Sequence, residues 1–182
     1  PWVAGLAYSF NSLLQPHYLW HWVFEGIPIF KLTAALSILA FCIHASRSGA
    51  DFSVYRNKQT FLIVSLLVWM HFSNLFSSFP GSSASVPPET VLETMNTIVL
   101  MYLVLVFLFN NDVGLKYISH IFLFSFLYYV YWANSAYFNQ EWFRFLNNRL
   151  VGPSMSPYND ANVLSTLIVM GLPFLMLYFF RT

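Results

Sequence analysis

Arg149 stands in a polar, turn-rich stretch, "NNRLVGPSMSPYNDANV" at residues 147–163, between two very apolar segments. An arginine fork at the rim of a membrane cavity, near a helix N-terminus, is suited to a phosphate or pyrophosphate. Two simpler interpretations are open as well, because Arg149 can form an ion pair with Asp160 or contact lipid headgroups. The stretch therefore predicts either an anion site or a local structural contact.

The residues after Arg149 are expected to shape such a site. Glycine and proline interrupt regular helix, and Asn or Asp preceding an apolar run accepts hydrogen bonds from the free N–H groups of a helix start. Asn159 or Asp160 is thus the predicted N-cap of the last apolar segment. The site-shaping and capping residues are Gly152, Pro153, Asn159, Asp160 and Asn162.

Two further cations are candidate ligands of a diphosphate. Arg144 follows Glu141 by three residues in "EWFRFL", a pattern that also favours an interfacial amphipathic helix with an internal ion pair. Lys31 lies a few residues inside an apolar segment, with Glu25 as its predicted partner. A lysine there either has a function or extends its ammonium group to the interface.

Histidines offer little support for a metal site. His17 and His21 are four residues apart and can share a helix face, but no third ligand is near in sequence. His44, His71 and His120 are isolated and are expected to form hydrogen bonds between helices. The chain has no phosphate-binding glycine loop, hydrolase elbow or paired metal motif, so we predict no cofactor and no metal.

The composition indicates which elements hold these residues. Of the 182 residues, 58% are hydrophobic and only 8% are charged, against about 25% in soluble domains. The chain is therefore predicted to be an integral membrane protein in contact with membrane lipids. A net charge of +1 provides no electrostatic footprint for nucleic acid. With Cys42 as the only cysteine, a disulfide within the chain is excluded.

Long apolar runs predict an all-α, polytopic transmembrane helical bundle of about six spans. A membrane-spanning helix needs roughly 20 mostly apolar residues, and continuous rather than alternating runs argue against a β-barrel. The first predicted span is short. The six segments are Trp2–Leu14, Ile27–Ala45, Thr60–Phe76, Val91–Phe109, Val113–Ala133 and Ala161–Phe180.

Basic residues predict the orientation of these spans. The loop at residues 46–59 carries Arg47, Arg56 and Lys58, which places it on the cytoplasmic side. Alternation then puts residues 134–159 on the outer side, although this loop contains two arginines that topology disfavours there. The chain begins at Pro1 and ends directly after an apolar segment, so residues 1–182 are interpreted as a single transmembrane domain that forms the N-terminal part of a longer membrane protein.

Several motifs, in order along nearly the whole chain, resemble a known family. "NRLVGPSMSPYNDANVLSTLIVMGLPFLMLYFFR" is similar to the start of the membrane domain of O-antigen ligases and O-antigen polymerases. "PWVAGLAYSFNSLLQPHYLWHWVFEGIPIF" and "PPETVLETMNTIVLMYLVLVFLF" resemble the branch of O-glycosylation ligases found with exosortase systems, with Gln15 in place of its Asn. Two lysines of that branch are replaced here, one by "WAN" at 132–134 and one by Asn96 or Thr97.

The resemblance implies a glycosyltransferase of polysaccharide biosynthesis in the cell envelope. Such an enzyme moves a glycan from undecaprenyl diphosphate to an acceptor on the outer face of the bacterial inner membrane. The diphosphate itself is the leaving group, so the reaction needs no nucleotide. Arg149 would stabilise the negative charge that develops on the diphosphate. The family's later outer-loop His and Arg residues lie outside this sequence, so no catalytic residue is assigned here. The alternative is an inactive accessory or structural subunit of a larger membrane complex.

Overall fold

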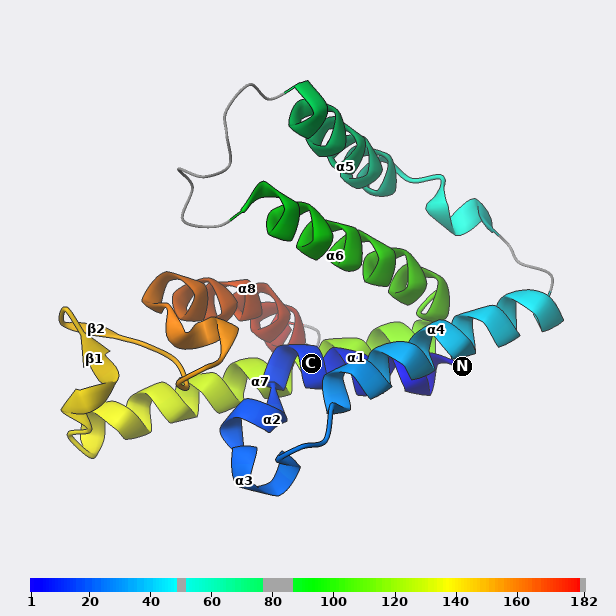
Figure 1. The fold of residues 1–182 in the computed structure, drawn as a ribbon. Helices are drawn as coiled ribbons and strands as arrows, with labels where there is room; N and C mark the ends of the chain where they lie inside the picture. The colour runs from blue at the N-terminus through cyan, green and yellow to red at the C-terminus, as the bar shows by residue number, and fades with distance from the viewer. Residues whose placement is uncertain (49–51, 77–86, 181–182) are drawn as a thin grey trace. The chain divides into compact units, whose positions relative to one another are not determined.

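The computed structural model of the protein describes residues 1–48, 52–76 and 87–180. Its long elements are helices, joined by short 3-10 turns and one two-stranded hairpin (Figure 1). The helices are α1 (Trp2–Leu14), α2 (Pro16–Leu19), α3 (His21–Phe24), α4 (Ile29–Ser48), α5 (Lys58–Phe76), α6 (Pro88–Leu108), α7 (Asp112–Phe138) and α8 (Ala161–Phe180). The strands are β1 (Phe145–Leu146) and β2 (Arg149–Leu150).

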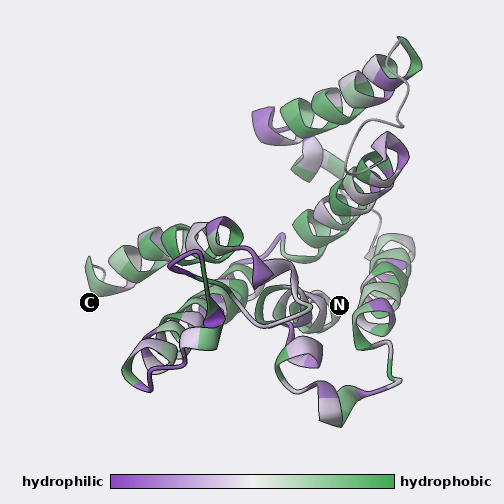
Figure 2. Cartoon of the chain, turned by 60° about the vertical axis from the view of Figure 1, so that its left-hand side comes forward, coloured by the Kyte–Doolittle hydropathy of each residue, from purple (hydrophilic) through white to green (hydrophobic). Residues whose placement is uncertain are grey.

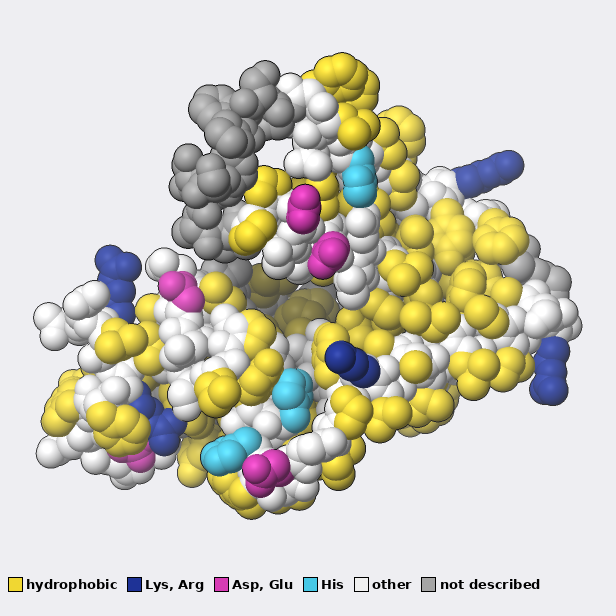
Figure 3. Space-filling view, viewed as in Figure 1, with side chains coloured by type: hydrophobic (Ala, Val, Ile, Leu, Met, Phe, Trp, Pro, Cys, Tyr) yellow, Lys and Arg dark blue, Asp and Glu magenta, His cyan; other side chains and the backbone are white. Residues whose placement is uncertain are grey.

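Five of these helices, α4 to α8, are long and apolar enough to cross a membrane, counted over the described residues. Their bounds match the predicted spans within a few residues, except that α7 continues to Phe138, five residues beyond the prediction. Hydrophobic residues recur along these helices (Figure 2), and hydrophobic side chains are exposed over much of the surface seen in Figure 3. Helix α1 has 13 residues, so at 1.5 Å per residue it measures about 20 Å, less than the roughly 30 Å hydrocarbon core. The all-α, multi-pass membrane fold is therefore confirmed.

The chain divides into two compact units. The first contains residues 1–5 and 34–111. In it α5 packs against α6, and two hydrogen bonds join side chains of the pair: His71 Nε2 lies 2.8 Å from Asn96 Oδ1, and Thr60 Oγ1 lies 3.1 Å from the Tyr102 hydroxyl. The prediction that His71 forms a hydrogen bond between helices is confirmed.

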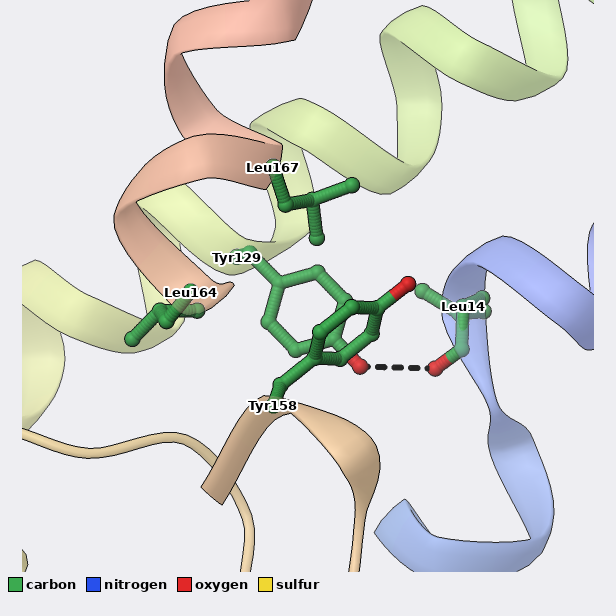
Figure 4. Close-up of a cluster of buried hydrophobic side chains, with 5 residues drawn as sticks. All are labelled: Leu14, Tyr129, Tyr158, Leu164 and Leu167. Atoms are coloured by element: carbon green, nitrogen blue, oxygen red, sulfur yellow. Dashed lines mark hydrogen bonds between the residues drawn. The ribbon is translucent and has the colours of Figure 1, made fainter. Parts of the chain in front are cut away.

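The second unit contains residues 6–33 and 112–182. Here α7 packs against α8, and the contact is close: a Cβ added to Gly171 of α8 would lie 2.3 Å from the Phe126 ring of α7. A buried cluster joins α7 and α8 to the end of α1 and to the 3-10 turn Pro157–Asn159 (Figure 4). Its members are Leu14, Tyr129, Tyr158, Leu164 and Leu167.

Candidate anion site on the Arg149 hairpin

Arg149 lies on a tight β-hairpin inside the second unit. Phe145 pairs with Leu150 and Leu146 with Arg149, which leaves Asn147 and Asn148 as a two-residue loop. Their φ angles are 51° and 61°. Two positive φ angles are typical of a type I′ turn, which asparagine tolerates and whose twist matches that of the strands. The turn thus fixes the backbone immediately before Arg149, whose side chain is exposed.

Arg144 precedes the same hairpin but has several local partners. Its Nε lies 2.5 Å from Glu141 Oε2, close enough for an ion pair although the N–H is not aligned for a hydrogen bond. Its guanidinium carbon lies 4.7 Å from the ring centroid of Trp132 and 5.3 Å from that of Phe143. The predicted Glu141–Arg144 pair is confirmed. The predicted amphipathic helix is wrong, since the segment forms a single 3-10 turn, Trp142–Arg144, followed by β1.

The loop after the hairpin is closed by backbone contacts that require glycine. The Gly152 N–H donates to the Tyr158 carbonyl oxygen (2.8 Å), and a Cβ at position 152 would lie 2.3 Å from that oxygen. The Ser156 hydroxyl donates to the Pro153 carbonyl (2.7 Å) and accepts from the Tyr158 N–H (3.1 Å). Gly152 and Pro153 are both buried, and both take part in the hydrogen bonds that close this loop.

Asp160 caps α8. Its Oδ1 accepts hydrogen bonds from the N–H groups of Asn162 (2.8 Å) and Val163 (3.2 Å), which confirms the predicted N-cap. Asn159 instead ends the 3-10 turn and donates its N–H to the Ser156 carbonyl (3.0 Å). Because the Asp160 carboxylate occupies these two N–H groups, a bound anion would depend on Arg149 rather than on the start of α8.

The expected ion pairs of Arg149 and Lys31 are not formed. Within residues 1–48, 52–76 and 87–180, no carboxylate pairs with Arg149, so the Arg149–Asp160 interpretation is not supported. Over the same ranges Lys31 has no ion pair with Glu25, and its side chain is exposed on the first turn of α4. Arg144, Arg149 and Lys31 belong to one compact unit, in which Arg144 and Arg149 lie at the same hairpin and Lys31 lies on α4.

Two tyrosines that the sequence reasoning missed hold this loop against the end of α1. The Tyr129 hydroxyl donates to the Leu14 carbonyl, and the Tyr158 hydroxyl donates to the Leu13 carbonyl, both at 2.9 Å. The two rings meet edge to face with centroids 5.0 Å apart (Figure 4). Burial raises the pKa of the Tyr158 hydroxyl to about 12, so it remains a donor at neutral pH.

The local backbone explains why α1 needs these donors. The Tyr158 hydroxyl also lies 3.5 Å from the Ser12 carbonyl, and the residue four positions after Ser12 is Pro16, which has no N–H to donate. Four residues after Leu14 stands Tyr18, whose N–H donates to the Gln15 carbonyl instead (3.0 Å). Gln15 itself has φ 53°. The signal in the sequence was therefore a proline two residues after a helix, although nothing local indicates which distant hydroxyls complete the bonds.

The histidines near this joint do not form a metal centre. His17 contacts the rings of Tyr18 and Phe30, at centroid distances of 4.2 and 6.4 Å, and burial lowers its pKa. In the parts of the chain that the structure describes, no three His, Cys, Asp or Glu side chains come together as metal ligands. Chemically, the hairpin offers an exposed guanidinium on a backbone held by a tight turn, and such a group can bind an anion.

The comparisons with known proteins give one family. No curated protein and no solved structure matches the chain. The model of a family of unknown function, DUF5935, matches residues 1–141, which include the helices from α1 to α7. The match ends before the hairpin and the Gly152–Asp160 loop. Since it extends over well more than half of the sequence, the chain belongs to this DUF5935 family of unknown function.

Proposed function

We propose that the chain is part of a membrane glycan ligase or polymerase that moves an undecaprenyl-diphosphate-linked glycan to an acceptor on the outer face of the bacterial inner membrane. The resemblance to O-antigen ligases along the sequence supports the reaction class. The observation that carries the proposal is the environment of the Arg149 side chain. It is exposed on a hairpin with a two-residue turn and has no carboxylate partner among the described residues.

Arg149 is the proposed diphosphate ligand because a guanidinium suits a phosphate group that gains negative charge as it leaves. A guanidinium offers two parallel N–H donors to phosphate oxygens, and a type I′ turn holds its backbone before any ligand arrives. Preorganised donors stabilise a transition state because they need not reorganise while charge develops on the leaving group. In the proposed reaction the acceptor hydroxyl oxygen bonds to the sugar anomeric carbon as that carbon's bond to the diphosphate breaks, and the hydroxyl proton is released to water.

Arg144 and Lys31 have weaker support as direct ligands. Arg144 is committed to Glu141 and to the Trp132 ring, so we assign it the role of positioning the start of the hairpin against α7. Trp132 begins the "WAN" segment, where the branch that the chain resembles has a lysine. The Arg144 guanidinium lies over the Trp132 ring and so places a positive charge near the position of that lysine. Lys31 is exposed and stays a predicted ligand.

Transfer rates of arginine variants test the proposal. In membranes containing the full-length protein and a polyprenyl-diphosphate-linked glycan, Arg149→Ala should slow transfer by about 10²–10³, the usual effect of losing one preorganised donor. Arg149→Lys should recover part of this rate, since an ammonium cannot form the bidentate fork. Arg144→Ala should be milder. Lys116→Ala, an exposed cation on the predicted inner side, is the matched control and should change the rate less than twofold.

A second candidate, an inactive accessory subunit, is favoured by a different observation. Among the described residues no three metal-ligating side chains come together, and no carboxylate pairs with Arg149. The intact mass of the polypeptide purified from its native membrane separates the two candidates. A mass that adds a second large domain supports the enzyme. A mass near that of residues 1–182, together with unchanged transfer in Arg149→Ala, would overturn it and support the accessory subunit.

A further inference from the structure

A groove in the first unit combines two cations with an apolar wall. A pocket of about 500 Å³ is lined by Tyr55, Arg56, Asn57, Lys58, Phe61 and Leu62, where the chain enters α5. Arg56 and Lys58 are exposed at its rim, and no carboxylate pairs with either of them in the described ranges. Phe61 and Leu62 follow one helical turn later and are 72% and 65% exposed.

The backbone that carries the two cations is held in place by α6. The Tyr55 hydroxyl donates to the Leu103 carbonyl (2.9 Å), and Thr60 bonds to the Tyr102 hydroxyl. Asn57, which lies between the cations, accepts the Thr60 N–H at Oδ1 (2.7 Å) and so caps α5. The positions of Arg56 and Lys58 are thus determined by packing on both sides of them.

A second groove continues from the first along α5. It has a volume of about 400 Å³, and its lining residues are Phe61, Val64, Ser65, Val68, Trp69 and Phe72. Phe61 belongs to both grooves. The spacing of three or four residues places the stripe on one helix face, and at 1.5 Å per residue it extends about 16 Å beyond Phe61. That length is about half of a 30 Å hydrocarbon core, the depth of one leaflet.

We propose that this groove binds an anionic phospholipid, with the phosphate between Arg56 and Lys58 and an acyl chain along the stripe from Phe61 to Phe72. Topology alone requires basic residues somewhere in the loop, but it does not require two of them at the head of an apolar groove one leaflet deep. A phosphate diester satisfies the two cations, and an acyl chain covers the exposed rings. A free phosphate would bind the two cations but would leave the exposed rings uncovered.

Lipid binding by the chain in nanodiscs tests the proposal. After delipidation, mass spectrometry counts the lipid molecules that stay bound to the chain. More palmitoyl-oleoyl phosphatidylglycerol than zwitterionic phosphatidylcholine should remain. The Arg56→Gln/Lys58→Gln variant should bind it roughly 30-fold more weakly, at about fivefold for each cation removed near a membrane surface. The matched control, Arg47→Gln/Lys116→Gln, removes two exposed cations predicted on the same side and should stay within twofold. Equal losses in both variants, or no preference for the anionic lipid, would overturn the proposal.

Two further measurements separate the lipid from other sources of the same chemistry. Phosphatidylglycerol with a brominated acyl chain should quench the fluorescence of Trp69. The contribution of Trp69 is the part of the quenching that disappears in Trp69→Phe, and this part should also disappear in Arg56→Gln/Lys58→Gln. Inorganic phosphate should displace the lipid no better than sodium chloride of equal ionic strength. Displacement by phosphate alone would identify a free-anion site, and absent quenching in the unmodified chain would remove the acyl chain from α5. Either result refutes the inference.

Discussion

Replacing Tyr129 with phenylalanine should remove one hydroxyl and leave a buried carbonyl of α1 without its donor. Tyr129 is fully buried, and Leu14, whose carbonyl accepts the bond, is 1% exposed, so water cannot replace the hydroxyl. An unsatisfied buried acceptor costs about 1–3 kcal/mol, whereas the ring contacts with Tyr158 are retained. At roughly 2–4 °C per kcal/mol for a domain of this size, the melting temperature should fall by about 2–12 °C.

Thermal unfolding in a mild detergent, followed by circular dichroism, measures this effect. Tyr131→Phe is the control on the same helix, because Tyr131 is 71% exposed and its change should stay within about 0.5 kcal/mol. Tyr158→Phe should resemble Tyr129→Phe, and the double variant should depart from additivity because the rings touch. If Tyr129→Phe and Tyr131→Phe have the same melting temperature, the Tyr129 hydroxyl does not stabilise the end of α1 and the argument fails.

Three other predictions follow from the same loop and from the charge pattern. Gly152→Ala should cost about 2 kcal/mol or more, since its Cβ would meet the Tyr158 carbonyl, and limited proteolysis should then cut the loop faster. The raised pKa of Tyr158 means that its contribution is complete below pH 10 and is lost as pH rises through about 12, so the unmodified chain should lose more stability there than Tyr158→Phe. In a Cys42→Ser background, an impermeant thiol reagent should label Ser154→Cys but not Ser48→Cys in intact cells, and the reverse pattern would refute the orientation.

The spans and the cap of α8 could be predicted because their signals are local. Continuous apolar runs determine where a helix can cross a membrane, and Asp160 stands directly before such a run. The hairpin was also readable in principle. The dipeptide Asn147–Asn148, flanked by "FL" and "RLV", is typical of a two-residue turn, and it overrides the helical spacing of Glu141 and Arg144.

The joint at the end of α1 could not be predicted in this way. Tyr129 and Tyr158 lie 115 and 145 residues from the carbonyls that they serve, and tyrosine in an apolar segment equally suits an interface or a core. Whether Arg149 forms an ion pair with Asp160 also depends on tertiary structure, since spacing alone made that pair plausible. Groups far apart in sequence can be matched only when the packing of α1, α7 and the loop is known.

The tyrosine-capped end of α1 also sets an order of events during synthesis. A ribosome adds about 5–20 residues per second, so Tyr129 follows Leu14 by roughly 6–23 s and Tyr158 follows Leu13 by roughly 7–29 s. During that interval the last carbonyls of α1 must be hydrated or held by a chaperone or the translocation machinery. Helix α1, which precedes the other described helices in the chain, is therefore among the last of them to be completed, and its final docking must wait for the loop that carries Arg149.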